Sequence, residues 1–224
     1  MREWEQLWIN GGKHFFVVRF TIFRLFELNP STFMYQKIAL AIAFSPRIEA
    51  LIAEVKRLVL LFDSELILIH VGVKTPELEK KLTELIKKNQ CDPAKSKVLW
   101  KEGKPVKMIL QACREEKVDL LVAGALKQEG LFKYYMGSVG RKIIRKSPCS
   151  VLTLIEPRVK TSEFSRVVIN GTQLEITPQV IKHGLEFSKV VKADQVSILN
   201  EIKMYGLQMG TASEDSEEEI AHTR

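Results

Sequence analysis

The chain has 224 residues, of which 46% are hydrophobic and 27% charged, which is typical of a soluble globular protein and excludes a low-complexity or fibrous one. The formal net charge of +7 comes mainly from residues 34–156, which carry 22 basic and 14 acidic side chains. The positive potential of this segment favours anionic ligands, but it does not distinguish a nucleotide from a nucleic acid. Lysines of this kind usually belong to a solvated helix face. Cys91, Cys113 and Cys149 form no CxxC pair and fit buried thiols in a reducing cytoplasm.

Residues 1–33 stand apart because they hold six of the eleven phenylalanines in the chain. The apolar run over 15–26 is too short to span a bilayer and is interrupted by Arg19 and Arg24. Glu3 and Glu5 stand where a signal peptide carries positive charge. A membrane-surface helix is one interpretation. We expect instead a packed or disordered extension, or a non-native start upstream of Met34, which immediately precedes the first regular strand.

From residue 37 the sequence alternates between short apolar runs and segments with helical spacing. The runs predict strands over 38–43, 65–71, 97–100, 119–124 and 150–155. Helices are predicted after Ser45-Pro46, with Ser45 as N-cap, after Thr75-Pro76, after Gly103, and over 138–146. Strands separated by helices of this length form βαβ units, so we expect an open α/β fold with a parallel sheet over residues 34–156.

Residues 157–224 begin the same order again. A strand over 166–170, a helical stretch over 176–185 and a strand over 195–199 repeat residues 37–71 at an offset of roughly 127 residues, and an acidic run follows over 214–219. We therefore expect a partial second repeat with an acidic tail. Half a domain cannot cover its own sheet, so it must pack on the first domain or on another chain.

A glycine-rich segment between the fourth strand and the fourth helix is the candidate ligand site. In open parallel sheets, ligands bind at the carboxyl ends of the strands where the strand order reverses, here near Ala43 and Gly124. Gly137 and Ser138 begin a helix whose free backbone N–H groups suit an anion. The segment from Gly124 to Ser138 has the length to fold over a triphosphate. Glycine spacing alone is weak support, because turns also need glycine.

Five stretches together resemble the universal stress protein family, and the similarity spans about residues 36–156. They are residues 37–45, 66–71, 119–124, 136–139 and 147–151, in that order along the chain. Residues 165–202 resemble the first half of a second such domain. The resemblance implies an adenine nucleotide alpha hydrolase-like fold with a five-stranded sheet of order 3-2-1-4-5 and helices on both faces. It also implies dimerisation through the edge of the last strand.

Some members of this family bind ATP through Gly-x-x-Gly, a nine-residue spacer and Gly-Ser or Gly-Thr. Gly124, Gly137 and Ser138 match that pattern, but Lys127 stands at the second glycine and Ala43 stands where an acidic residue usually ends the first strand. The residues expected to line the crevice, with ATP as the candidate cofactor, are Ala43, Ser45, Val71, Gly124, Lys127, Gly130, Gly137, Ser138 and Val139.

The resulting hypothesis is a cytoplasmic, non-enzymatic stress-response module with a regulatory or scaffolding role and a degenerate nucleotide site. Its expected partners are a second copy or an intrachain pseudo-dimer, and a regulatory protein, with no membrane. One alternative is an ATP-binding protein, at most a weak ATPase, that uses Lys127 at the phosphates. A basic nucleic-acid-binding protein is the less favoured alternative. No catalytic or metal-binding set stands out, and we expect His70 to be a packed residue and Asp119 a structural cap.

Overall fold

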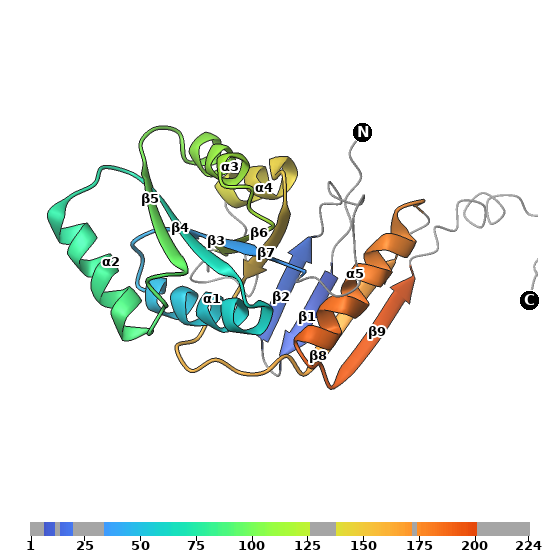
Figure 1. The fold of residues 1–224 in the computed structure, drawn as a ribbon. Coiled ribbons are helices and arrows are strands. Elements are labelled where there is room, and N and C mark those ends of the chain that lie inside the picture. Colours follow the sequence, from blue (N-terminus) through green and yellow to red (C-terminus); the bar gives the residue numbers. More distant parts are fainter. Residues whose placement is uncertain (1–6, 12–13, 20–33, 126–137, 172–173, 201–224) are drawn as a thin grey trace, which may run out of the picture.

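The computed structural model describes residues 7–11, 14–19, 34–125, 138–171 and 174–200, whose helices and strands are drawn in Figure 1. Strands and helices alternate through the described part of residues 34–154. The strands are β3 (Lys37–Ile42), β4 (Glu65–Val71), β5 (Ser96–Lys101), β6 (Leu120–Gly124) and β7 (Ser150–Leu154). The helices are α1 (Ile48–Phe62), α2 (Pro76–Lys88), α3 (Pro105–Glu115) and α4 (Ser138–Lys146).

These five strands form a parallel sheet in the order β5-β4-β3-β6-β7, which confirms the predicted fold class and the order 3-2-1-4-5. β3 lies in the centre, paired with β4 on one side and β6 on the other. The order reverses there, because the chain runs outward from β3 to β5 and then returns to β6.

Both faces of the parallel sheet are buried, as apolar strands between helices require. Successive side chains of β3 point to opposite faces, so Ile38, Leu40 and Ile42 join one apolar cluster while Ala39 and Ala41 belong to the other. The first cluster lies under α1 and α2, and the second lies under α3 and α4. Figure 1 shows these helix pairs on either side of the sheet.

The N-terminal extension contributes two strands to the sheet, which the sequence analysis did not predict. β1 (Leu7–Gly11) and β2 (His14–Arg19) pair with each other in antiparallel register. β2 also pairs with β7, Val18 opposite Leu152, and both pairings are antiparallel. The outer edge of β7, where the family resemblance implied a second copy, is therefore paired with this chain's own β2.

The second unit continues the same sheet. It consists of β8 (Arg166–Gly171), α5 (Thr177–Val190) and β9 (Gln195–Asn200), with β8 and β9 parallel. β1 pairs with β8 in antiparallel register, so the described strands form one nine-stranded sheet of order β5-β4-β3-β6-β7-β2-β1-β8-β9. The hairpin β1–β2 joins the two units between their strands β7 and β8, as Figure 1 shows.

Aromatic side chains join the second unit to the first. Phe187 of α5 lies 5.7 Å, centroid to centroid, from Phe62 at the end of α1, and 5.9 Å from Phe164 in the connecting segment. The Arg57 guanidinium of α1 sits 4.1 Å above the Phe164 ring, while its Nη2 is 3.1 Å from a carboxylate oxygen of Glu54. Offset aromatic contacts and a cation over a ring stabilise this junction beyond the area buried. The half-domain thus packs against the first unit.

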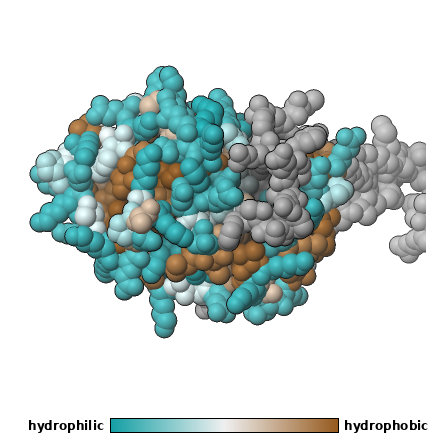
Figure 2. Space-filling model, viewed as in Figure 1, coloured by the Kyte–Doolittle hydropathy of each residue, from teal (hydrophilic) through white to brown (hydrophobic). Residues whose placement is uncertain are grey.

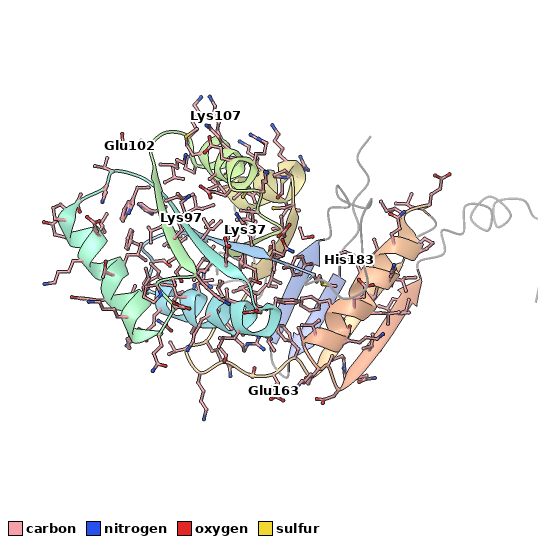
Figure 3. The ribbon with its side chains drawn as sticks, in the orientation of Figure 1. Lys37, Lys97, Glu102, Lys107, Glu163 and His183 are labelled. Carbon is pink, nitrogen blue, oxygen red and sulfur yellow. The ribbon has the colours of Figure 1, made fainter. Side chains whose placement is uncertain are left out.

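The surface separates charged and apolar regions. Charged side chains project from the helices and the outer strand, among them Lys97, whose Nζ lies 2.7 Å from Glu116 (Figure 3). Apolar surface extends over the region of β8, α5 and β9 in Figure 2, where Leu185, Ile198 and Leu199 are exposed. Among the described helices, none combines the length and the apolar composition that crossing a membrane requires.

Candidate functional site

The predicted crevice lies at the carboxyl ends of β3 and β6, which are neighbours in the sheet. Ala43 directly follows β3, and Gly124 is the last residue of β6. Both residues are exposed, so nothing among the described side chains covers this edge at those two positions. The structure therefore brings Ala43 and Gly124 to the point where the strand order reverses, which is the general location of ligands in open α/β sheets.

The turn after β3 differs from the prediction. The Ala43 carbonyl accepts a hydrogen bond from the Ser45 N–H at 2.7 Å, and the Ser45 carbonyl accepts one from the Ile48 N–H at 3.1 Å. α1 begins only at Ile48, its N-cap is Arg47, and no side chain caps it. The prediction of Ser45 as N-cap was wrong. Pro46 and Arg47 form a turn, which places the half-buried Ser45 three residues before the first residue of α1.

Arg47 is the residue of this site that sequence reasoning missed. Its guanidinium donates from Nη1 to the Ile155 carbonyl at 3.2 Å and from Nη2 to the Ala125 carbonyl at 2.5 Å. A half-buried cation thus lies at the carboxyl ends of both β6 and β7. One signal was present: a basic side chain before a helix N-terminus opposes the helix dipole, so such a residue usually has another partner.

Gly124 has a packing reason to be glycine. A Cβ at this position would lie 3.2 Å from both Cδ atoms of Leu51 on α1. The next residue, Ala125, donates its N–H to the Leu154 carbonyl at 2.8 Å and extends the pairing of β6 with β7. Close contact between strand and helix therefore accounts for this glycine without a ligand.

The remaining crevice residues are only partly described. Ser138 and Val139 form the first turn of α4, and both are exposed, as an anion site at a helix N-terminus requires. α4 carries no acidic residue in that turn. Lys127, Gly130 and Gly137 lie outside the described residues, so their place relative to Ser138 stays a prediction.

His70 and two aromatic rings pack beside the crevice. The His70 ring makes edge contacts with Phe44 and Trp100 at 4.8 and 4.9 Å between centroids. Its Nδ1 lies 3.2 Å from the Ile42 carbonyl, which accepts its hydrogen bond. A Cβ on Gly72 would lie 2.9 Å from Nε2 of the same ring. His70 is a packed residue, as predicted, and half-buried Val71 lies between it and the turn at Gly72.

Other chemistry is sparse in the described part of the chain. No group of three or more His, Cys, Asp or Glu side chains there could hold a metal ion. Asp119 accepts hydrogen bonds at Oδ2 from the backbone N–H groups of Gln36 and Lys37, at 3.1 and 3.0 Å. This arrangement confirms Asp119 as a structural cap at the start of β3.

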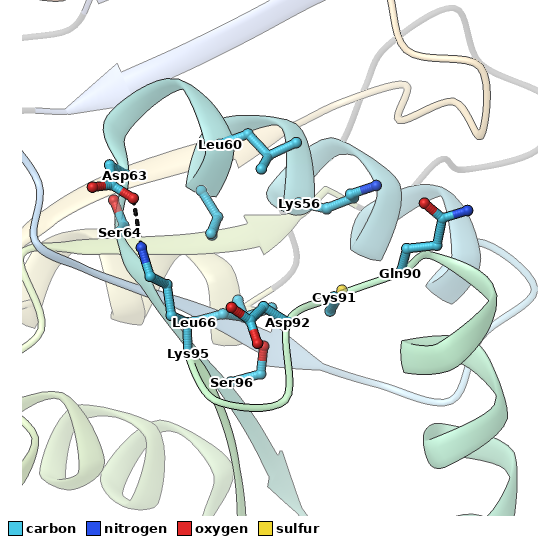
Figure 4. Close-up of a pocket in the computed structure, with 11 residues that line it drawn as sticks. Lys56, Leu60, Asp63, Ser64, Leu66, Gln90, Cys91, Asp92, Lys95 and Ser96 are labelled. Atoms are coloured by element: carbon cyan, nitrogen blue, oxygen red, sulfur yellow. Dashed lines mark hydrogen bonds and ion pairs between the residues drawn. The ribbon is translucent and has the colours of Figure 1, made fainter.

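A pocket of about 170 Å³ lies at the opposite end of the sheet, between the second half of α1 and the segment before β5 (Figure 4). Val59, Leu60 and Leu66 contribute to its apolar wall, and an ion pair of 2.6 Å between Lys95 Nζ and Asp63 lies at its rim. It borders the amino end of β4 and therefore does not belong to the crevice at Ala43 and Gly124.

Comparison with known proteins finds a family match for part of the chain. Residues 72–154 match the family model described as the universal stress protein family, and the matched segment includes β5, β6 and β7 and the glycine-rich stretch. The resemblance to universal stress proteins is thereby confirmed for this part of the chain.

Two curated relatives carry the same family name. A universal stress protein of Methanocaldococcus jannaschii is 33% identical over 57 residues, which are 25% of this chain and 34% of that protein. The Thermus aquaticus universal stress protein in the QAH/OAS sulfhydrylase 3′ region is 37% identical over 51 residues, 23% of this chain and 37% of that protein. The matches thus span about a third of the length of each relative.

Among solved structures, the comparison also finds universal stress proteins. A universal stress protein in complex with cAMP aligns with a TM-score of 0.45 and 20% identity, covering 55% of this chain and 97% of that one. An Arabidopsis thaliana family member with AMP bound aligns with a TM-score of 0.40 and 20% identity, covering 56% and 95%.

Proposed function

We propose that this chain is a non-enzymatic universal stress protein with a regulatory or scaffolding role, and that its adenine-nucleotide site is degenerate. The family match over residues 72–154 supports the general assignment. The observation that carries the degenerate site is exposed Ala43 at the end of β3, because a methyl group there accepts no hydrogen bond from a ligand hydroxyl.

The loss of binding has two sources. A carboxylate missing at position 43 removes hydrogen bonds worth about 0.5–3 kcal/mol. Lysine at 127, if that position needs a positive φ, adds about 1–2 kcal/mol of backbone strain. Together these losses of about 1.5–5 kcal/mol weaken nucleotide binding by about one to three and a half decades, because each decade corresponds to about 1.4 kcal/mol.

Calorimetric titration with ATP and magnesium tests this proposal. The native chain should show no saturable binding at micromolar nucleotide, whereas Ala43→Asp combined with Lys127→Gly should gain affinity by about two decades. The single variants Ala43→Asp and Lys127→Gly measure the contributions of the two positions separately. A native chain that binds ATP at low micromolar concentration, or that copurifies with it, would contradict the degenerate site.

The position of Arg47 supports a second candidate function, in which positive charge in the crevice binds the phosphates of ATP. Its guanidinium lies half-buried at the ends of β6 and β7 and presents further N–H donors beyond the two that bond Ala125 and Ile155. Lys127 would be the second cation. In this case Arg47→Gln and Lys127→Ala should each weaken ATP binding while Lys127→Gly preserves it, and a thermal shift with ATP and magnesium should be measurable. With a degenerate site, Arg47→Gln and Lys127→Ala behave like the native chain, whereas Lys127→Gly recovers part of the lost affinity.

The proposed partners follow from the sheet. β2 occupies the edge of β7, so the intrachain arrangement replaces a second copy at that strand. A regulatory protein partner and a cytoplasmic location remain part of the proposal. We do not expect the chain to bind nucleic acid. Binding detected in a filter assay at low salt would contradict this expectation.

A further inference from the structure

β9 lies at one edge of the nine-stranded sheet, and no described residue pairs with its outer side. The Gln195 N–H donates to the Ser165 carbonyl at 3.0 Å, so the backbone groups of Gln195 point toward β8. In a strand the backbone groups of successive residues point to alternate sides, so those of Val196 and Ile198 point away from β8. Unpaired N–H and C=O groups along an edge are a template for pairing with another strand.

The two edges of the described sheet, β5 and β9, differ in charge. β5 carries Lys97 and Lys101, whose ammonium groups pair with Glu116 and Glu115 at the end of α3. Charged side chains protect an edge strand from pairing with another chain. β9, with the sequence QVSILN, contains no charged residue. A further strand can therefore pair with β9 without meeting a charge, whereas β5 resists such pairing.

The first unit shows what covers the strand that corresponds to β9. The first residue pairs of β3 with β4 and of β8 with β9 align the two units, so Val196 corresponds to Leu66 of β4. Ile198 likewise corresponds to Leu68. Leu66 and Leu68 are 2% and 0% exposed, because β5 pairs with the outer side of β4 and α2 covers this face. Val196 and Ile198 are 39% and 49% exposed, so the described part of the chain gives β9 no such cover.

We propose that the outer edge of β9 is a dimer interface, at which β9 pairs in antiparallel register with β9 of a second copy of this chain. A two-fold axis at Ser197, perpendicular to the sheet, places Val196 of each copy opposite Ile198 of the other. Both residues direct their backbone groups outward, so each of the two pairs exchanges two N–H···O bonds. The second copy thus supplies a neighbouring strand and its own α5 on the same face, where β5 and α2 lie in the first unit.

A second copy fits this edge by its chemistry. Val196 and Ile198 lie on the face that α5 covers, because their partners in β8 include Ile169, which approaches α5. Two apolar side chains therefore meet two others across the axis. Asp194 directly precedes β9, and the register places it about 20 Å from Asp194 of the second copy, so these like charges do not meet. Apolar surface continues from β9 over α5, where Leu185 is exposed (Figure 2).

Light scattering after size exclusion, over a series of protein concentrations, tests whether the full chain is a dimer. Its mass should rise to twice that of one chain. Ser197→Cys then tests the register, because two residues opposite each other on the axis have Cα atoms about 4.5 Å apart, which a disulfide can bridge. Mild oxidation should join the two copies of this variant. Asp194→Cys is the matched control and should not cross-link, and Cys91, Cys113 and Cys149 are buried in the native chain.

Ile198→Pro tests the backbone pairing itself. The Ile198 N–H points away from β8, so proline should leave the fold of each copy intact, as circular dichroism would show. It should raise the dissociation constant of the dimer by about 100-fold, because two hydrogen bonds between the copies are lost. Ile198→Ala keeps the N–H and should raise the dissociation constant less.

Three results would overturn the proposal. A native chain that stays monomeric over the whole concentration series would mean that other residues of the chain, or another protein, cover β9. Equal cross-linking through positions 194 and 197 would exclude the register centred on Ser197. An Ile198→Pro variant that dimerises like the native chain would place the interface elsewhere. If that variant fails to fold, the cross-linking of Ser197→Cys against Asp194→Cys still decides the question.

Discussion

At the scale of single residues, Asp119 shows how one carboxylate fixes the starts of two neighbouring strands. It precedes β6, and its Oδ2 accepts the N–H groups of Gln36 and Lys37 at the start of β3. An acidic residue before an apolar run was visible in the sequence. Its partners lie more than 80 positions away, and only the pairing of β3 with β6 brings them within reach.

Replacing Asp119 should destabilise the protein measurably. Asp119→Ala leaves two backbone donors without their acceptor, and we expect the free energy of unfolding to fall by about 1.5–3 kcal/mol. Asp119→Asn is the matched control, since its side-chain oxygen still accepts hydrogen bonds, and it should cost less. Urea unfolding of both variants measures the difference. Equal losses would show that the hydrogen bonds to Gln36 and Lys37 contribute little.

His183 on α5, labelled in Figure 3, should make stability depend on pH. Burial lowers its pKa from 6.5, with nearby Lys182 acting in the same direction and Glu186 opposing it. Below about pH 6.5 the unfolded chain gains a proton that the folded chain binds less well, so stability is lost as the pH falls. His183→Gln should flatten the unfolding free energy between pH 7 and pH 5. An unchanged slope in that variant would assign the pH dependence to other groups.

At the scale of elements, periodicity predicted the core of the fold well. β4 and α4 have the predicted bounds, and β3, β5, β6 and β7 differ only at their ends. β1 and β2 were not predicted, because the phenylalanine-rich run fitted a membrane-surface helix or a packed or disordered extension. Gly11-Gly12 between two apolar runs is typical of a short hairpin turn and was the available signal. That β2 would pair with β7 depends on contacts distant in sequence, which local patterns do not contain.

The close packing of α5 on β8 can be tested by substitution. A Cβ on buried Gly184 would lie 2.7 Å from Cδ1 of Ile169 on β8, so the helix backbone approaches the strand closely. Gly184→Ala should lower the unfolding free energy by about 1–3 kcal/mol through overpacking. Ile169→Ala removes the obstructing atoms, so the double variant should be more stable than the sum of the single changes predicts. Additive losses in chemical denaturation would mean that α5 does not pack on β8 in this way.

At the scale of the whole molecule, the hairpin makes one sheet out of two units. β2 has a partner on each side, β7 and β1, and residues 16–18 are paired with both. For the candidate crevice, the sequence predicted that Ala43 and Gly124 lie at neighbouring strand ends, and the pairing of β3 with β6 confirms this arrangement, while the role of Ser138 stays a prediction. The sequence did not predict the Arg47 contacts, because their partners are backbone carbonyls 78 and 108 positions away, and the basic residue near a helix N-terminus was the one signal present.

A proline in β2 should affect the entire sheet. Val17 lies opposite both Trp8 and Thr153, so Val17→Pro removes a ladder hydrogen bond and should lower the unfolding free energy by about 3 kcal/mol. The exposed edge of β7 should then promote self-association, which light scattering after size exclusion would detect. Val17→Ala keeps its N–H and is the control. If the proline variant matches that control in stability and mass, β2 is not part of the sheet in solution.

The central hairpin also constrains the order of events during synthesis. Asn10 in β1 pairs with Arg166 in β8, which the ribosome adds 156 residues later. Synthesis at about 5–20 residues per second therefore delays the pairing of β1 with β8 by about 8–30 seconds. During that interval an apolar hairpin is available to chaperones, and the five strands of the parallel sheet, β3 to β7, are all synthesised before β8.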